Sequence, residues 1–278
     1  MFFPILAFFL GNLPNFLAKI LFELLYPVYL LKFKKEKDYI SGRLKKANLQ
    51  IKPKEVYKNL FFNGLDSLKF LQNKKVPVKM ENFDLAQNEC IVFVSIHLGA
   101  FEMLHRALGA GGKVNLVVSE FKNKKLNKFL ENLRETENIK IVRDSEVSQI
   151  LKNVIRNKEI LAIMADQSKS GGEHFEILGQ SVPLFLRLPI TANKLGASVV
   201  LFRTFRKNGE HIIRIERVYE PCSKINPAEV AKTFESWILE HPEQWTWNFV
   251  YLSHEEYRQN HVHRRNRLYS RNSWSFRL

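Results

Sequence analysis

The segment CIVFVSIHLGAFEMLHRAL, residues 90–108, decides the fold because it joins a strand to a helix through a tight turn. Residues 90–95 are mostly apolar and rich in β-branched side chains, which predicts a short buried strand. Residues 100–108 predict a short helix that ends at Gly109. Strands that alternate with helices at this spacing are typical of α/β domains with parallel strands.

The same alternation continues along the chain. We expect further strands at 113–119, 139–143 and 159–165, and helices at 55–72, 124–137, 146–158, 188–196 and 227–245. Residues 198–206 and 210–218 flank a Lys-Asn-Gly turn and predict an antiparallel hairpin. The sequence therefore predicts an α/β fold with a mixed, largely parallel sheet flanked by helices.

Two polar residues, His97 and Asp166, directly follow predicted strands. Sites in open α/β sheets form at the carboxyl ends of the strands. Glu102 follows His97 by five residues, and Gly99 between them permits an unusual turn. The Glu102 carboxylate would accept a hydrogen bond from one ring nitrogen of His97 and leave the other free as a base. The alternative is that His97 is only a polar turn residue.

The segment offers no nucleophile of its own for such a base. Cys90 lies about 23 Å from His97 along a straight strand of about 3.3 Å per residue. Ser95 lacks the G-x-S-x-G surroundings of a nucleophile elbow. Glu102 and His105 form one E-x-x-H motif, but a di-iron site needs a second. The pair therefore suits activation of a substrate hydroxyl, as in acyl transfer, and we expect neither a metal nor another cofactor.

The composition indicates a polyanionic partner. The 278 residues include 43 Lys and Arg against 28 Asp and Glu, which gives a formal net charge of +15. Such a surplus suits nucleic acid, an anionic membrane face or an acidic protein. Two cysteines without a spacing motif fit a reducing compartment.

Residues 1–33 favour the membrane among these partners. Lys19 and Glu23 are the only charges in the first 31 residues, although Gly11 and Pro14 interrupt the apolar run. We expect a hydrophobic anchor that either spans the bilayer or lies in its interface; the alternative is a buried core helix. Lysines and an arginine follow closely, which places this flank on the cytoplasmic face.

Four stretches of the chain resemble a known family. HLGAFE, IMADQS, GASVV and HPEQWTWNFVY, in this order, are similar to the late acyltransferases of bacterial lipid A synthesis, the lauroyl/myristoyl transferase type. HLGAFE matches the H-x4-D/E motif of the wider acyltransferase superfamily. The phosphate-binding F-P-E-G motif of its glycerolipid branch is absent. Gln167 and Ser168 depart from the commonest family pattern, so only Asp166 carries over from that stretch.

The resemblance implies roles for particular residues. His97 would be the general base and Glu102 its orienting partner, while Arg134 and Asp166 would bind substrate near the active centre. The alternatives are a solvated helix end for Arg134 and a helix or turn cap for Asp166. Trp245 and Trp247 match the family's C-terminal mark, but their type favours a core or interfacial role.

The resemblance also implies the reaction and its place. The fold would be glycerolipid-acyltransferase-like, with an anchor at 1–33, a catalytic domain at 34–258 and a basic tail at 259–278. The enzyme would move a fatty acyl chain from acyl carrier protein to a hydroxyl of a lipid A precursor, on the cytoplasmic face of a bacterial inner membrane. We expect no nucleic-acid partner.

Two alternative functions stay open from the sequence. One is acylation of another lysolipid or aminolipid, and the other is a non-enzymatic, membrane-anchored basic binding protein.

A cluster of four lysines also has two interpretations, docking of the acidic donor or a merely solvated surface: Lys122, Lys124, Lys125 and Lys128.

Overall fold

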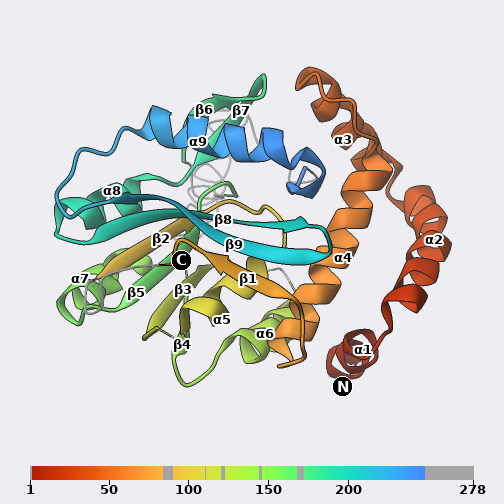
Figure 1. Ribbon diagram of the computed structural model, residues 1–278, viewed down its shortest axis with the longest axis horizontal. Coiled ribbons are helices and arrows are strands. Elements are labelled where there is room, and N and C mark those ends of the chain that lie inside the picture. The colour runs from red at the N-terminus through yellow and green to blue at the C-terminus, as the bar shows by residue number, and fades with distance from the viewer. Residues whose placement is uncertain are drawn as a thin grey trace, which may run out of the picture.

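The computed structural model describes residues 2–83, 90–109, 111–119, 123–143, 146–167 and 172–247 (Figure 1). Lys122, Ser168 and the predicted basic tail at 259–278 lie outside the described residues. The remaining predicted site residues all fall within them.

Four helices precede the first strand: α1 (Phe2–Gly11), α2 (Asn15–Lys32), α3 (Lys34–Lys46) and α4 (Pro53–Leu71). The predicted anchor is therefore divided between α1 and α2, with Pro14 at the junction. Figure 1 shows both helices at the periphery, outside α4. Among the described residues, no helix combines the length and apolarity needed to cross a membrane.

The main sheet has the strand order β1-β9-β8-β2-β5-β3-β4. Its strands are β1 (Val78–Glu81), β2 (Ile91–Ser95), β3 (Val114–Val118), β4 (Ile139–Arg143), β5 (Ile160–Met164), β8 (Ser198–Lys207) and β9 (Glu210–Tyr219). All neighbours pair in parallel except β8 and β9, which form the predicted antiparallel hairpin. The predicted mixed, largely parallel sheet is confirmed.

The remaining elements connect or cover these strands. They are η1 (Phe101–Met103), α5 (Leu104–Gly109), α6 (Lys124–Arg134), α7 (Val147–Arg156), α8 (Arg187–Lys194), α9 (Pro227–Glu240) and η2 (Pro242–Gln244). A separate antiparallel pair consists of β6 (Glu173–Ile177) and β7 (Gln180–Leu184). The helix predicted at 100–108 begins as the 3₁₀ turn η1 before it continues as α5.

The central strand β2 is buried on both faces, as its unbroken apolar run predicts. Val92 and Val94 belong to the core cluster that includes residues of α7, α8 and α9. Ile91 and Phe93 point the other way and belong to the cluster that includes residues of α5. Figure 1 shows α9 and α5 on opposite sides of the sheet. This packing fixes where β2 ends, and therefore where His97 begins the following turn.

Candidate active site

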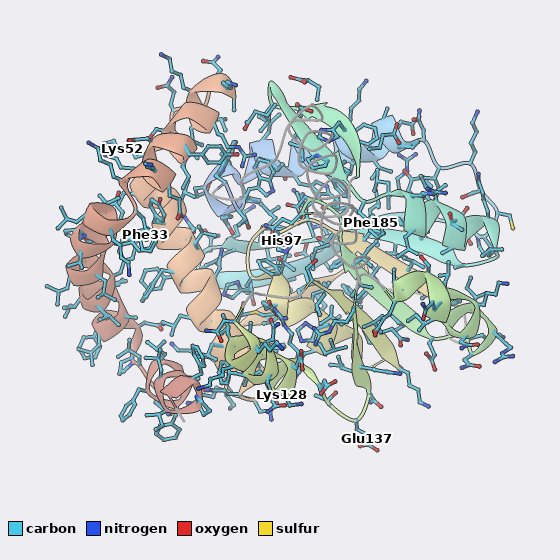
Figure 2. All side chains as sticks on the ribbon, turned by 180° about the vertical axis from the view of Figure 1, so that it is seen from behind. Phe33, Lys52, His97, Lys128, Glu137 and Phe185 are labelled. Carbon is cyan, nitrogen blue, oxygen red and sulfur yellow. The ribbon has the colours of Figure 1, made fainter. Side chains whose placement is uncertain are left out.

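His97 and Asp166 lie side by side because their strands are neighbours in register. Ser95 of β2 pairs with Met164 of β5, so the residues two places further on also face each other. Parallel strands bring their carboxyl ends to one edge of the sheet. His97 lies near the centre of the molecule in Figure 2. The predicted strand ends therefore placed both residues correctly at one edge.

Asp166 accepts hydrogen bonds at both carboxylate oxygens. His97 Nδ1 lies 2.7 Å from Oδ1, and the backbone N–H of His97 donates to the same carboxylate at 3.0 Å. Trp245 Nε1 donates to Oδ2 at 2.9 Å. An ionised carboxylate only accepts hydrogen bonds, so Nδ1 must carry the proton in the neutral ring. The other ring nitrogen, Nε2, is then the basic one.

The surroundings of Asp166 favour its ionised form. Its side chain is 1% exposed, and burial alone raises the pKa of this carboxyl. Attraction to His97 and the hydrogen bonds from His97 and Trp245 outweigh burial, so the net pKa lies below the usual value. Asp166 is therefore a charged acceptor at neutral pH.

Glu102 bonds to Arg134 and not to the ring of His97, which corrects the predicted pair. Arg134 Nε donates to Glu102 Oε2 at 2.9 Å, and its NH2 group donates to Oε1. The reason is geometric: Glu102 lies in η1, and α6 ends with Arg134 against it, while Asp166 already occupies Nδ1 of His97. Arg134 is thus no solvated helix end, since its side chain is 12% exposed.

Arg134 also governs the charge of Glu102. Burial alone raises the pKa of the Glu102 carboxyl, but the Arg134 guanidinium and its hydrogen bond hold the pKa below the usual value. His97 lowers it further by electrostatic attraction, so the two pairs lie close enough to interact. The four predicted site residues therefore form two neighbouring pairs, His97 with Asp166 and Glu102 with Arg134.

His105 is a buried neighbour of the second pair. Its side chain is 2% exposed, and burial lowers its pKa to about 4, with Arg134 adding to the decrease. Glu102 acts in the opposite direction but does not compensate. The His105 ring is consequently neutral at pH 7.

The turn after His97 depends on Gly99. Its φ is +60°, and a Cβ there would lie 2.6 Å from the backbone oxygen of Thr204. Thr204 Oγ1 donates to the Leu98 carbonyl at 2.6 Å, which holds the turn against β8. Any side chain at position 99 would therefore push the His97 turn away from the sheet.

Residues 241–247, here called the C-terminal strap, cover the same turn. Gly99 N donates to the Gln244 carbonyl at 3.1 Å, and Thr246 donates to the His97 carbonyl from its backbone N and its Oγ1. Trp245 is fully buried within the strap and reaches Asp166. The predicted core role of Trp245 is correct but incomplete, because its indole N–H also contacts the site.

Phe101 is a site neighbour that sequence reasoning missed. Its ring meets the His97 ring edge-on, with 4.6 Å between centroids. The quoted motif HLGAFE contains Phe101 between the two titratable residues, so its position was available as a signal. This contact restricts the imidazole in addition to the hydrogen bond between its Nδ1 and Asp166.

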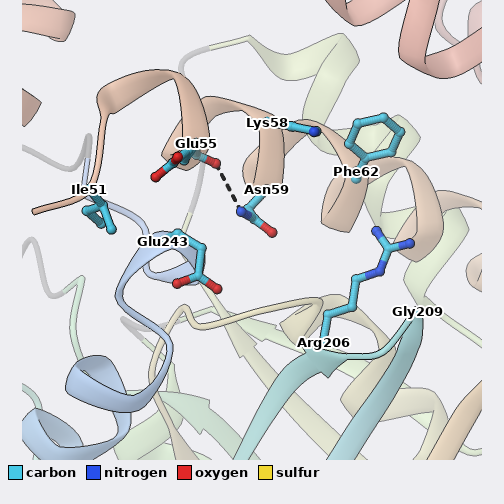
Figure 3. Close-up of a pocket in the computed structure, with 8 residues that line it drawn as sticks. All are labelled: Ile51, Glu55, Lys58, Asn59, Phe62, Arg206, Gly209 and Glu243. Carbon is cyan, nitrogen blue, oxygen red and sulfur yellow. Dashed lines mark hydrogen bonds between the residues drawn. The ribbon is translucent and has the colours of Figure 1, made fainter.

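A pocket of about 550 Å³ is lined by none of the four residues His97, Glu102, Arg134 and Asp166 (Figure 3). Its walls come from α4, the β8–β9 hairpin and η2, with Lys58, Arg206, Glu55 and Glu243 as its charged residues.

In the described part of the chain, no group of three or more His, Cys, Asp or Glu is arranged to hold a metal ion.

The chain was compared with protein-family models, with curated proteins and with solved structures. The sequence model described as bacterial lipid A biosynthesis acyltransferase matches residues 67–249, which include all four site residues. No curated protein matches the chain. Among solved structures, the 1-acyl-sn-glycerophosphate (LPA) acyltransferase PlsC from Thermotoga maritima is similar at 14% identity and a TM-score of 0.40, over 81% of this chain and 94% of that one.

Proposed function

The chain belongs to the bacterial lipid A biosynthesis acyltransferase family and is an O-acyltransferase, and from this premise we propose its donor, its acceptor and its catalytic groups. The donor is acyl carrier protein and the acceptor is a hydroxyl of a lipid A precursor. Family membership excludes the alternative of a non-enzymatic basic binding protein. The proposal rests chiefly on the His97–Asp166 hydrogen bond, which leaves one ring nitrogen of a strand-end histidine free as a base.

His97 is the general base in this proposal. Its Nε2 takes the proton from the acceptor hydroxyl while the oxygen attacks the thioester carbonyl of the donor. The new C–O ester bond forms and the C–S bond breaks. The imidazolium then returns its proton to the departing thiolate, so no further reactant is needed. Asp166 stabilises the imidazolium and acts on the ring, in place of the substrate-binding role that the resemblance suggested.

Arg134 is the substrate-binding residue, and Glu102 holds it in place. Two donor groups of the guanidinium are occupied by Glu102, which fixes its plane and leaves its remaining N–H groups for substrate. Anionic oxygens suit these groups, whether on the acceptor or developing at the thioester carbonyl. Glu102 therefore contributes to catalysis through Arg134, not through His97.

Three described lysines support an acidic donor. Lys124, Lys125 and Lys128 are exposed at the start of α6, which follows β3 at the same sheet edge as His97. Figure 2 shows Lys128 on that helix. Complementary charge of this kind steers association with an acidic protein.

The N-terminal helices support an interfacial contact with the membrane. Twelve of the sixteen exposed large apolar residues in the described part of the chain lie in this region: Ile5, Leu6, Phe8, Phe9, Phe16, Leu17, Ile20, Leu24, Leu25, Val28, Leu31 and Phe33. An apolar surface of this kind next to lysines suits the headgroup boundary of an anionic bilayer. Deletion of residues 1–31 should abolish salt-resistant binding to anionic vesicles, and retained binding would place the contact elsewhere.

Purified enzyme, labelled acyl-acyl carrier protein and a lipid A precursor test the proposal together. Mass spectrometry of the product should show one added acyl chain, released as a fatty acid by mild alkali as expected of an ester. A lysophospholipid offered in parallel serves as the competing acceptor. Transfer to the lysophospholipid alone would overturn the proposed acceptor, and use of acyl-coenzyme A alone would overturn the proposed donor.

A further inference from the structure

Arg43 is an unusual residue of α3. The helix is rich in solvent-exposed lysines, yet Arg43 is only 5% exposed. Burying a guanidinium is costly unless its donors are satisfied and its charge is compensated. The contacts of Arg43 therefore indicate why an arginine stands at this position.

Arg43 contacts the C-terminal strap in two ways. Its NH1 group donates to the Trp247 carbonyl at 2.7 Å, and its Nε donates to Gln180 Oε1 on β7. Its guanidinium carbon lies 4.8 Å from the centre of a Trp245 ring and 5.3 Å from that of Trp247. A planar guanidinium can stack on indoles and donate at its edge at the same time, which an ammonium group cannot.

These contacts lead directly to the proposed base. Trp245 donates through Nε1 to Asp166 at 2.9 Å, and Asp166 accepts from His97 Nδ1 at 2.7 Å. Arg43 thus fixes the indole whose N–H holds one oxygen of the carboxylate that holds the ring. We propose that Arg43 is a positioning residue for acyl transfer, which it supports by orienting Trp245 towards Asp166. This inference rests on the proposed roles of His97 and Asp166.

Arg43→Lys tests the proposal, since it keeps the charge and loses the fork and the flat stacking surface. We expect kcat to fall about tenfold or more while KM for either substrate changes less than about twofold, because misplaced catalytic groups slow the chemical step. Arg156→Lys is the matched control, since Arg156 is exposed at the end of α7. Unchanged kcat in Arg43→Lys, or a loss confined to KM, would overturn the proposal.

A double-mutant cycle with Trp245→Phe separates positioning from general packing. Trp245→Phe keeps an aromatic ring but removes the N–H that reaches Asp166. If Arg43 acts through that N–H, Arg43→Lys should cost less than about threefold in the Trp245→Phe background, because coupled residues are not additive. Equal costs in both backgrounds would show that Arg43 acts by another route.

The indole N–H resonance of Trp245 gives a readout that needs no activity. In Arg43→Lys it should move towards its position in Asp166→Asn, whereas Arg156→Lys should leave it unchanged. If Arg43→Lys does not fold, Gln180→Leu replaces it, since this change removes the acceptor of Arg43 Nε without changing any residue of α3. An unmoved resonance in whichever variant folds contradicts the inference. A shifted resonance in an enzyme that does not need His97 would instead contradict the proposed function.

Discussion

The two carboxylates of the site differ in what surrounds them. Asp166 is 1% exposed and accepts from N–H groups of His97 and Trp245. Glu102 is 23% exposed and is paired with the guanidinium of Arg134. Both are held in the charged form, but only one of them touches the ring that would act as a base. Their partners, and not their distance from His97 along the chain, indicate their roles.

The two carboxylates also show that nearness to His97 in the sequence does not predict contact with its ring. Glu102 is five residues from His97 in sequence, yet it faces the end of α6. Asp166 is 69 residues away and adjoins His97 because β2 and β5 are parallel neighbours. From the sequence alone, either Glu102 or Asp166 could be taken as the partner of His97. The order of strands in the sheet shows that the partner is Asp166.

Breaking the Asp166 pair should have the largest effect. In Asp166→Asn the amide NH₂ must face Trp245 Nε1–H or the His97 Nδ1–H, so one donor loses its acceptor. The ring also loses the negative charge that stabilises imidazolium. We expect kcat to fall about 10²–10⁴-fold. Initial rates of acyl transfer at saturating concentrations of both substrates measure this. Activity above roughly a tenth of wild type would remove Asp166 from the mechanism.

Breaking the Glu102 pair should have a smaller effect of a different kind. Glu102→Gln can keep one hydrogen bond to Arg134 but loses the charge, so the guanidinium should be held less firmly. We expect kcat/KM to fall about 10–100-fold, with much of the loss in KM for the substrate that Arg134 binds. Arg134→Lys should show the same division. A pure kcat loss equal to that of Asp166→Asn would restore Glu102 as the partner of His97.

His105 extends the comparison to stability, because it lies beside the Glu102 pair. Its pKa in the folded protein is about 4, below the usual value, so only the unfolded chain takes up its proton as pH falls from about 7. Because of this difference in proton uptake, the free energy of unfolding should fall by about 2 kcal/mol as the pH is lowered from 7.5 to 5. Urea unfolding should show this loss in wild type and less of it in His105→Leu. Parallel pH dependences for the two proteins would contradict it.

The lysines at the start of α6 should give the smallest effect, and it concerns binding. Lys124→Glu with Lys125→Glu should raise KM for acyl carrier protein several-fold and leave kcat nearly intact, since exposed charges affect association more than chemistry. Raising salt should weaken the wild type more than the variant. Acyl-coenzyme A is the control donor. Equal harm to both donors, or to neither, would mean that these lysines do not dock the carrier protein.

Much of the fold followed from the pattern of apolar runs. The alternation of β2 to β5 with helices and the Lys-Asn-Gly hairpin were sufficient to predict a mixed sheet. By contrast, β1 is four residues long at the sheet edge and only partly buried, so its residues carry little apolar signal. Pro183 within β7 similarly weakens a strand pattern. The sequence signal was strongest where burial is complete.

The four residues singled out from the sequence lie near one another in the structure, but the way they pair could not be predicted. His97 and Asp166 were recognisable as residues after strand ends, whereas the order of strands, which makes β5 the neighbour of β2, depends on long-range packing. The contact between Arg43 and Trp245 was not predictable from the sequence for the same reason. Their contact joins α3 to the C-terminal strap across about 200 positions of sequence.

The central claim is that His97 is the base of an acyl transfer, and His97→Gln tests it most directly. Gln keeps a polar side chain of similar reach but cannot take up the hydroxyl proton. With acyl-acyl carrier protein and a lipid A precursor, the variant should keep its thermal unfolding temperature and its KM values. Its single-turnover transfer rate should fall at least about 100-fold. A folded variant that transfers the acyl chain at more than roughly a tenth of the wild-type rate would contradict the account.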